Sequence, residues 1–132
     1  MASVAPHPYR TALENRDAHV LLEALHPAVV FDSPAFEEPI HGRGNVLELF
    51  AVLAAVFEHP EITDELVGDG SRAVVFRTSV EGHQIDGVDY LKLDEAGRVR
   101  RITVTMRPLV SLQALAERMR DTVARLSGKV AG

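Results

Sequence analysis

The second half of the chain is built of β-strand patterns, and this feature constrains the fold most. Four runs rich in β-branched and apolar residues follow one another at 62–67, 72–80, 85–93 and 99–106. Short glycine-containing links separate them: Gly68-Asp69-Gly70, Glu81-Gly82 and Asp94-Glu95-Ala96-Gly97. Because links of this kind join neighbouring antiparallel strands, the pattern predicts a four-stranded meander.

The first half of the chain carries helical patterns instead. Apolar residues recur at i, i+3 and i+4 over 8–15, 18–25 and 45–58, and this spacing predicts three helices. A β-branched run at 28–31 predicts one strand between them. Two prolines and two glycines within 34–44 predict an irregular loop.

Helix-start signals support these predictions. Pro8 suits the first turn of a helix, and Asp17 is a good N-cap for the second. Asn45 and Glu48 resemble a capping box at the start of the third. A last helix is expected at about 111–126, where apolar residues again form one stripe.

Helices and strands are segregated along the chain, which is typical of an α+β fold. We expect a single domain over residues 1–132, with its core at about 8–108 and the last helix added to it. A curved antiparallel sheet wrapped around helices leaves one open mouth. Such a cup is a natural site for a small molecule.

Composition excludes several classes of function. The chain has no cysteine, so it has no thiol nucleophile, thiolate zinc site or disulfide, and a reducing cytoplasm suits it. A net charge of −5 argues against nucleic acid as a partner. The longest apolar run is too short for a membrane span, and the N-terminus lacks the pattern of a secretory signal. The six histidines have no metal-site spacing, so we expect neither a metal nor another cofactor.

One acidic residue stands out within the meander. Strand alternation puts Asp89 on the same face as Ile85, Gly87 and Leu91, among apolar side chains. Asp89 is then either a structural acid, paired with an arginine or with backbone N–H groups, or a functional one. In the functional case, desolvation raises its pKa and lets it donate a hydrogen bond to a ligand.

The opposite face of the sheet is polar without being fully charged. On the last strand it carries Arg101, Thr103 and Thr105, and Tyr90 and Val88 share this face on the strand before. Such a face is either exposed to solvent or covered by a second subunit. The exposed apolar residues favour a homodimer formed through the outer face of the sheet.

Three segments resemble the nuclear transport factor 2-like superfamily, also called SnoaL-like, which includes ketosteroid isomerases and polyketide cyclases. The segments are Val30-Phe-Asp-Ser-Pro34, Ile40-His-Gly-Arg43 and the stretch from Ile85 to Val99. The resemblance covers about Tyr9 to Pro108. It implies a cone-shaped curved sheet wrapped around N-terminal helices, a cofactor-independent activity and a small apolar ligand.

The resemblance to ketosteroid isomerases also implies roles for individual residues. Tyr9 falls at the position of a tyrosine that binds the substrate oxygen, and Asp89 falls at that of the oxyanion-binding aspartate. The position of the general base holds Ser33, which is a poor base without a histidine beside it. Asp32 is adjacent, but strand alternation directs it to the other face unless a bulge rotates it.

Three functions follow as hypotheses. The chain is an isomerase or cyclase acting on an apolar ketone or polyketide-like molecule, a binding protein that lacks the base, or a dimerisation domain with a filled core. In the first two, further residues are expected to line the cup beside the candidate catalytic ones. They are Phe31, Phe76, Thr78, Gly87, Leu91, Val104 and Met106.

Overall fold

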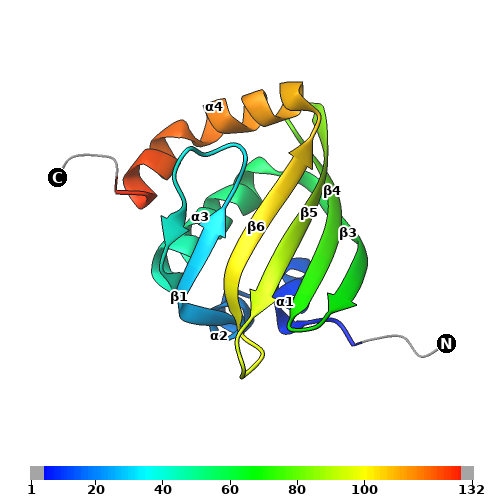
Figure 1. Ribbon diagram of the computed structural model, residues 1–132. Coiled ribbons are helices and arrows are strands. Elements are labelled where there is room, and N and C mark those ends of the chain that lie inside the picture. Colours follow the sequence, from blue (N-terminus) through cyan, green and yellow to red (C-terminus); the bar gives the residue numbers. More distant parts are fainter. Residues whose placement is uncertain (1–4, 129–132) are drawn as a thin grey trace.

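The computed structural model describes residues 5–128, and its main feature is one six-stranded sheet. The strands are ordered β2-β1-β6-β5-β4-β3 (Figure 1). Neighbours are antiparallel except β1 and β6, which run parallel; β2, α3 and the strands β3 to β5 separate them in sequence. The strands are β1 Leu25–Asp32, β2 Ile40–His41, β3 Glu58–Gly68, β4 Ser71–Val80, β5 His83–Leu93 and β6 Val99–Arg107.

The sheet curves around the helices, as expected for the α+β fold. The helices are α1 Pro8–Asn15, α2 Ala18–Ala24, α3 Arg43–Val56 and α4 Leu109–Leu126. In Figure 1, α3 lies behind the sheet, α1 and α2 lie at its lower end, and α4 crosses its upper end. Within residues 5–128, no helix has the length and apolar character needed to cross a membrane.

Strand alternation in β5 and β6 is confirmed. Ile85, Asp89 and Leu91 are buried on the inner face of β5, and Ile102 and Val104 are buried on the inner face of β6. The register of β4 with β5 is continuous over ten residue pairs, so no bulge disturbs the alternation there. The inner face therefore carries the core and Asp89 together.

The starts of the first two helices follow their sequence signals. Pro8 occupies the first turn of α1, and the His7 ring Nδ1 accepts the N–H of Tyr9 at 3.0 Å. Asp17 caps α2 by accepting the N–H groups of His19 and Val20 at 3.1 Å each. These caps satisfy backbone N–H groups in the first turns of α1 and α2 and so stabilise the two helix starts.

The segment before α3 differs from its prediction. The helix begins at Arg43, and Gly42 is its N-cap. Gly42 has a φ of 92°, a conformation that favours glycine, and no side chain caps this helix start. The predicted capping box is wrong, because the Asn45 amide donates to the carbonyl of His41 instead. The predicted loop also contains β2, whose Ile40 pairs with Phe31.

Two further boundaries move for local reasons. α2 ends at Ala24 and β1 begins at Leu25, earlier than predicted. Pro27 lies where the register with β6 shifts, so its missing N–H interrupts no regular ladder.

The edge strand β3 is the irregular part of the sheet. Its register with β4 shifts between Glu58 and Glu61, and again between Ile62 and Asp64. His59 has a φ of 48°, in the left-handed region. These irregularities rotate successive side chains away from simple alternation, and they lie at the end of α3.

Candidate functional site

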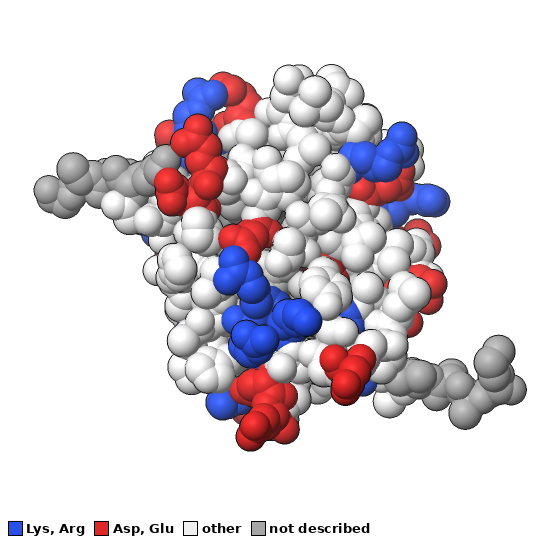
Figure 2. All heavy atoms as spheres, viewed as in Figure 1, with Lys and Arg blue, Asp and Glu red and all other residues white. Residues whose placement is uncertain are grey.

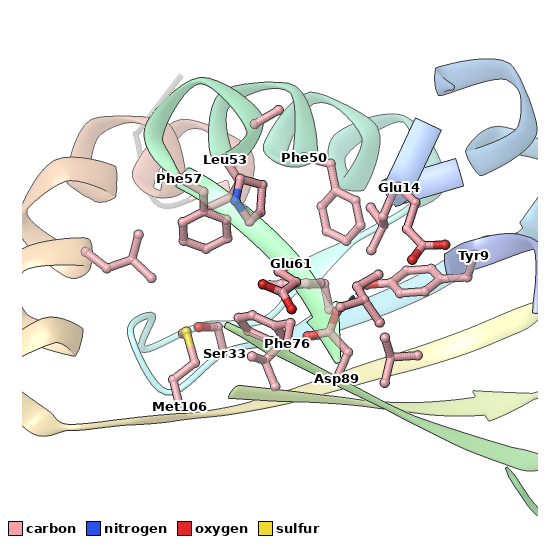
Figure 3. A pocket seen from close by; sticks show the side chains of 18 of the residues that line it. Tyr9, Glu14, Ser33, Phe50, Leu53, Phe57, Glu61, Phe76, Asp89 and Met106 are labelled. Carbon is pink, nitrogen blue, oxygen red and sulfur yellow. Dashed lines mark hydrogen bonds between the residues drawn. The ribbon is translucent and has the colours of Figure 1, made fainter. Parts of the chain in front are cut away.

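A cavity of about 470 Å³ lies between the inner face of the sheet and helices α1, α3 and α4 (Figure 3). Most of its lining is apolar. Aromatic rings enter from both sides, with Phe31 and Phe76 on strands and Phe50 and Phe57 on α3 and its C-cap. Phe31 and Phe50 meet edge to face, with ring centroids 5.5 Å apart. The space suits an apolar molecule of modest size.

Two polar side chains meet in this cavity. The Tyr9 hydroxyl, from the first turn of α1, donates a hydrogen bond of 2.8 Å to Oδ2 of Asp89 in the middle of β5 (Figure 3). Tyr9 is fully buried and Asp89 is 9% exposed. The Asp89 carboxylate is therefore bonded to a phenol, and no arginine pairs with it among residues 5–128.

Burial changes the ionisation of both groups. Desolvation raises the pKa of Asp89 from 3.8 to about 6, and the Tyr9 hydrogen bond opposes this rise. Desolvation also raises the pKa of Tyr9 well above its ordinary value, and the Asp89 charge and hydrogen bond add to the effect. Tyr9 is thus a neutral donor, and Asp89 holds its proton to a higher pH than an exposed aspartate does.

Five more of the predicted site residues line the cavity. They are Phe31, Ser33, Phe76, Val104 and Met106. Ser33 follows β1, and its Oγ accepts the N–H of Ala35 at 3.2 Å, which is a local turn contact. In Figure 3, Ser33 lies beside Met106, whereas Asp89 lies on the other side of Phe76 and Tyr9 lies farther still toward the right of the picture.

The other four predicted site residues do not line the cavity. Asp32 accepts a hydrogen bond from Arg101, because alternation in β1 turns it to the outer face. Thr78 is buried, and its hydroxyl donates to the carbonyl of Glu58 at 2.9 Å, which joins β4 to β3. Leu91 is fully buried in the core, and Gly87 lies beneath the ring of Phe76.

The sequence reasoning missed the ionisable residues at the cavity. Glu14 and Arg16 come from the end of α1, and His59 and Glu61 come from the start of β3. Their sequence pattern is that of ordinary exposed residues, so only the meeting of the two segments reveals them. Within residues 5–128, no group of three His, Cys, Asp or Glu side chains could hold a metal ion.

Residues 8–107 match the model of the SnoaL-like domain. The chain belongs to the SnoaL-like family. The match spans α1 and the whole sheet, and so includes both Tyr9 and Asp89. No protein in the curated sequence comparison matches this SnoaL-like chain significantly.

Solved structures resemble this SnoaL-like protein along most of its length. A steroid delta-isomerase from Pseudomonas aeruginosa is 31% identical, with a TM-score of 0.78, over 94% of this chain and 90% of that one. An uncharacterised protein with a cystatin-like fold from Silicibacter pomeroyi is 23% identical, with a TM-score of 0.80, over 86% and 81%. A polyketide cyclase candidate from Sinorhizobium meliloti is 19% identical, with a TM-score of 0.62, over 74% and 90%. The last two show the shared fold alone.

Proposed function

We propose that this SnoaL-like protein binds a small apolar ketone in the cavity and stabilises its enolate oxygen, as a cofactor-independent isomerase or cyclase. The observation that carries the proposal is the buried Tyr9–Asp89 pair, 2.8 Å apart, in an otherwise mainly apolar cavity. The similarity to a steroid delta-isomerase at 31% identity supports the reaction class.

The two polar groups suit an oxygen that gains negative charge. Tyr9 keeps its proton because its pKa is raised, so its hydroxyl can turn from Asp89 toward a ligand oxygen. An enolate oxygen beside Asp89 would raise the pKa of that carboxyl above its present value of about 6. Asp89 would then hold a proton and donate it in a second hydrogen bond, so both donors strengthen as the enolate forms.

The cavity lining restricts the ligand class. A volume of about 470 Å³ falls within the range of small-molecule sites, and its walls offer rings and aliphatic groups. Arg16 is the cationic residue on the α1 side, and it is exposed. A neutral, largely apolar ketone or polyketide-like molecule fits this environment better than a sugar or a phosphate.

A second candidate function is ligand binding without catalysis. Ser33 stands where the resemblance to ketosteroid isomerases implies a base, and its hydroxyl accepts a backbone N–H. A protein of this second kind would bind phenols or ketones through Tyr9 and Asp89 and would not turn them over. A dimerisation domain with a filled core is less favoured because of the cavity.

We also propose a homodimer through the outer face of the sheet, in the cytoplasm. Tyr90 is 40% exposed on this face, beside the half-buried Val88. Figure 2 views the molecule from this side, and uncharged side chains cover much of the middle, above a group of basic ones. Light scattering after size exclusion should give twice the monomer mass, and a monomer at all concentrations would reject the dimer.

Binding and turnover together test the main proposal. The chain has no tryptophan, so the fluorescence of 2-naphthol can report binding without interference. Isomerisation of cyclohex-3-enone to its conjugated isomer, followed by ultraviolet absorbance, reports turnover. We expect Asp89→Ala to weaken naphthol binding and to abolish turnover. Equal behaviour of wild type and variant would reject the proposed site, whereas binding without turnover would favour the second candidate.

A further inference from the structure

Enolate chemistry needs a base, and the expected positions do not supply one. The Ser33 hydroxyl is engaged with the N–H of Ala35 at 3.2 Å. Asp32 points to the outer face, where Arg101 binds it. The proposed isomerase or cyclase function therefore requires a proton acceptor from elsewhere on the cavity wall.

The cavity has two carboxylates besides Asp89. Glu14 on α1 accepts a hydrogen bond of 3.4 Å from Nε of Arg10 and is ion-paired with it. The Glu61 side chain, on β3, makes no hydrogen bond or ion pair with any residue that the structure describes. In Figure 3 the Glu61 carboxylate lies in the middle of the picture, between the rings of the aromatic wall and Asp89. The Glu61 carboxylate is therefore available to accept a proton, whereas the Glu14 carboxylate is engaged with Arg10.

The irregular start of β3 explains why an edge-strand glutamate borders the cavity. A regular strand would offer the cavity only every second side chain. Here four consecutive residues, 59–62, line it, because the register with β4 shifts on both sides of Glu61. The positive φ of His59 belongs to the same distortion. Bulges of this kind redirect side chains next to functional sites.

We propose that Glu61 is the general base of this protein, and this inference rests on the proposed function. For a β,γ-unsaturated ketone, the Glu61 carboxylate takes a proton from the α-carbon next to the carbonyl. The C–H electron pair forms a new carbon–carbon double bond, and the carbonyl π pair moves to the oxygen held by Tyr9 and Asp89, which gives a dienolate. The protonated Glu61 returns the proton to the γ-carbon while the carbonyl re-forms, so the double bond moves and no other reactant is consumed.

The position of Glu61 also fits reversible proton transfer. Its side chain is exposed to solvent, so a proton that it carries can exchange with water between transfers. Tyr9 and Asp89 are buried, so the oxygen site stays dry while the base stays accessible. We therefore expect the ketone to exchange its α-protons with deuterated water in the presence of the protein.

Glu61→Gln tests the assignment, with Glu14→Gln as the matched control at the same cavity. Cyclohex-3-enone isomerisation and α-proton exchange, followed by NMR in deuterated water, report proton transfer. 2-Naphthol, which needs no base, reports the oxygen site. We expect Glu61→Gln to lose about 100-fold or more in kcat and to bind naphthol within about twofold of wild type. Glu14→Gln, which changes the same cavity wall, should lose at least about tenfold less in kcat than Glu61→Gln.

Chemical rescue separates a base from a structural role. Glu61→Ala leaves space in an accessible wall, so added acetate should restore turnover in proportion to its concentration, and wild type should not respond. Unchanged turnover in Glu61→Gln, or a loss of kcat in Glu14→Gln equal to that in Glu61→Gln, would overturn the assignment of the base. Naphthol binding would still support the oxygen site formed by Tyr9 and Asp89. A wild type that binds naphthol but neither isomerises nor exchanges would overturn Glu61 and favour the binding protein. If the wild-type protein does not bind 2-naphthol, the proposed function itself is rejected.

Discussion

A methyl group added at Gly87 tests how the cavity is shaped. A Cβ built on Gly87 would lie 2.3 Å from Cζ of Phe76 and 2.7 and 2.9 Å from its two Cε atoms. Such approaches do not occur between real atoms, so the ring must move. Phe76 is the direct partner of Gly87 on β4, and its ring lines the cavity beside Phe57, with centroids 6.4 Å apart. The strands hold both backbones in place, so the Phe76 ring has to move into the cavity.

The magnitudes separate a stability effect from a binding effect. Overpacking a core costs about 1–3 kcal/mol, and replacing glycine by alanine in a strand returns about 0.5–1 kcal/mol. Because the clash involves the far end of a movable ring, we expect the low end of the overpacking cost, so the net loss in the free energy of unfolding should be at most about 0.5 kcal/mol. The displaced ring should weaken 2-naphthol binding about tenfold or more, or about 1.4 kcal/mol. Phenol, with one ring fewer, should bind nearly as before.

Urea unfolding and ligand titration of Gly87→Ala measure both effects, and Gly44→Ala is the matched control. A Cβ at Gly44 meets nothing within 4 Å. Gly44 lies inside α3, so alanine there should stabilise the protein by up to about 1 kcal/mol and leave binding unchanged. Adding Phe76→Leu to Gly87→Ala should recover naphthol affinity. An unchanged ratio of naphthol to phenol affinity in Gly87→Ala would refute the reasoning.

Three further predictions concern ionisable groups. Asp89→Asn should stabilise the protein by about 3 kcal/mol at pH 8 but not near pH 4, in urea unfolding. The pKa of Asp89 is raised from 3.8 to about 6 in the folded protein, so its protonated form favours folding fully below pH 3.8, and this contribution to stability is lost as the pH rises through 6. A stabilisation by Asp89→Asn that does not depend on pH would contradict this. Tyr9→Phe removes the donor that lowers the Asp89 pKa, so NMR titration of that carboxyl should give a higher value than in wild type, and an unchanged or lower one would count against the hydrogen bond. Asp32→Asn, on the outer face, should leave naphthol binding within about twofold of wild type; a larger loss would mean that Asp32 reaches the cavity.

The meander was predictable because its signals are local and agree with one another. Alternation along β5 put Asp89 among apolar neighbours, and the glycine-containing turns fixed the order of the strands. The oxygen-binding pair needed more than local pattern. Nothing in the periodicity of α1 singles out Tyr9, and its contact with Asp89, 80 positions away, was implied only by the family resemblance.

The parts that escaped prediction depend on backbone geometry that composition does not encode. Asn45 and Glu48 carry the letters of a capping box, yet Gly42 begins the helix through its own conformation. Glu61 reads as an ordinary edge-strand residue, and only the two register shifts in β3 bring it to the cavity. Thr78 and Leu91 have the right alternation for a wall, but packing uses them inside the sheet and the core.

A crystal structure of the protein with bound 2-naphthol tests the central claim most directly. The account predicts the naphthol ring in the cavity and its oxygen within about 2.5–3.0 Å of both the Tyr9 hydroxyl and an Asp89 carboxyl oxygen. The present contact of 2.8 Å between the two side chains would open to admit that oxygen. Naphthol bound elsewhere, or bound in the cavity with its oxygen away from Tyr9 and Asp89, would contradict the account.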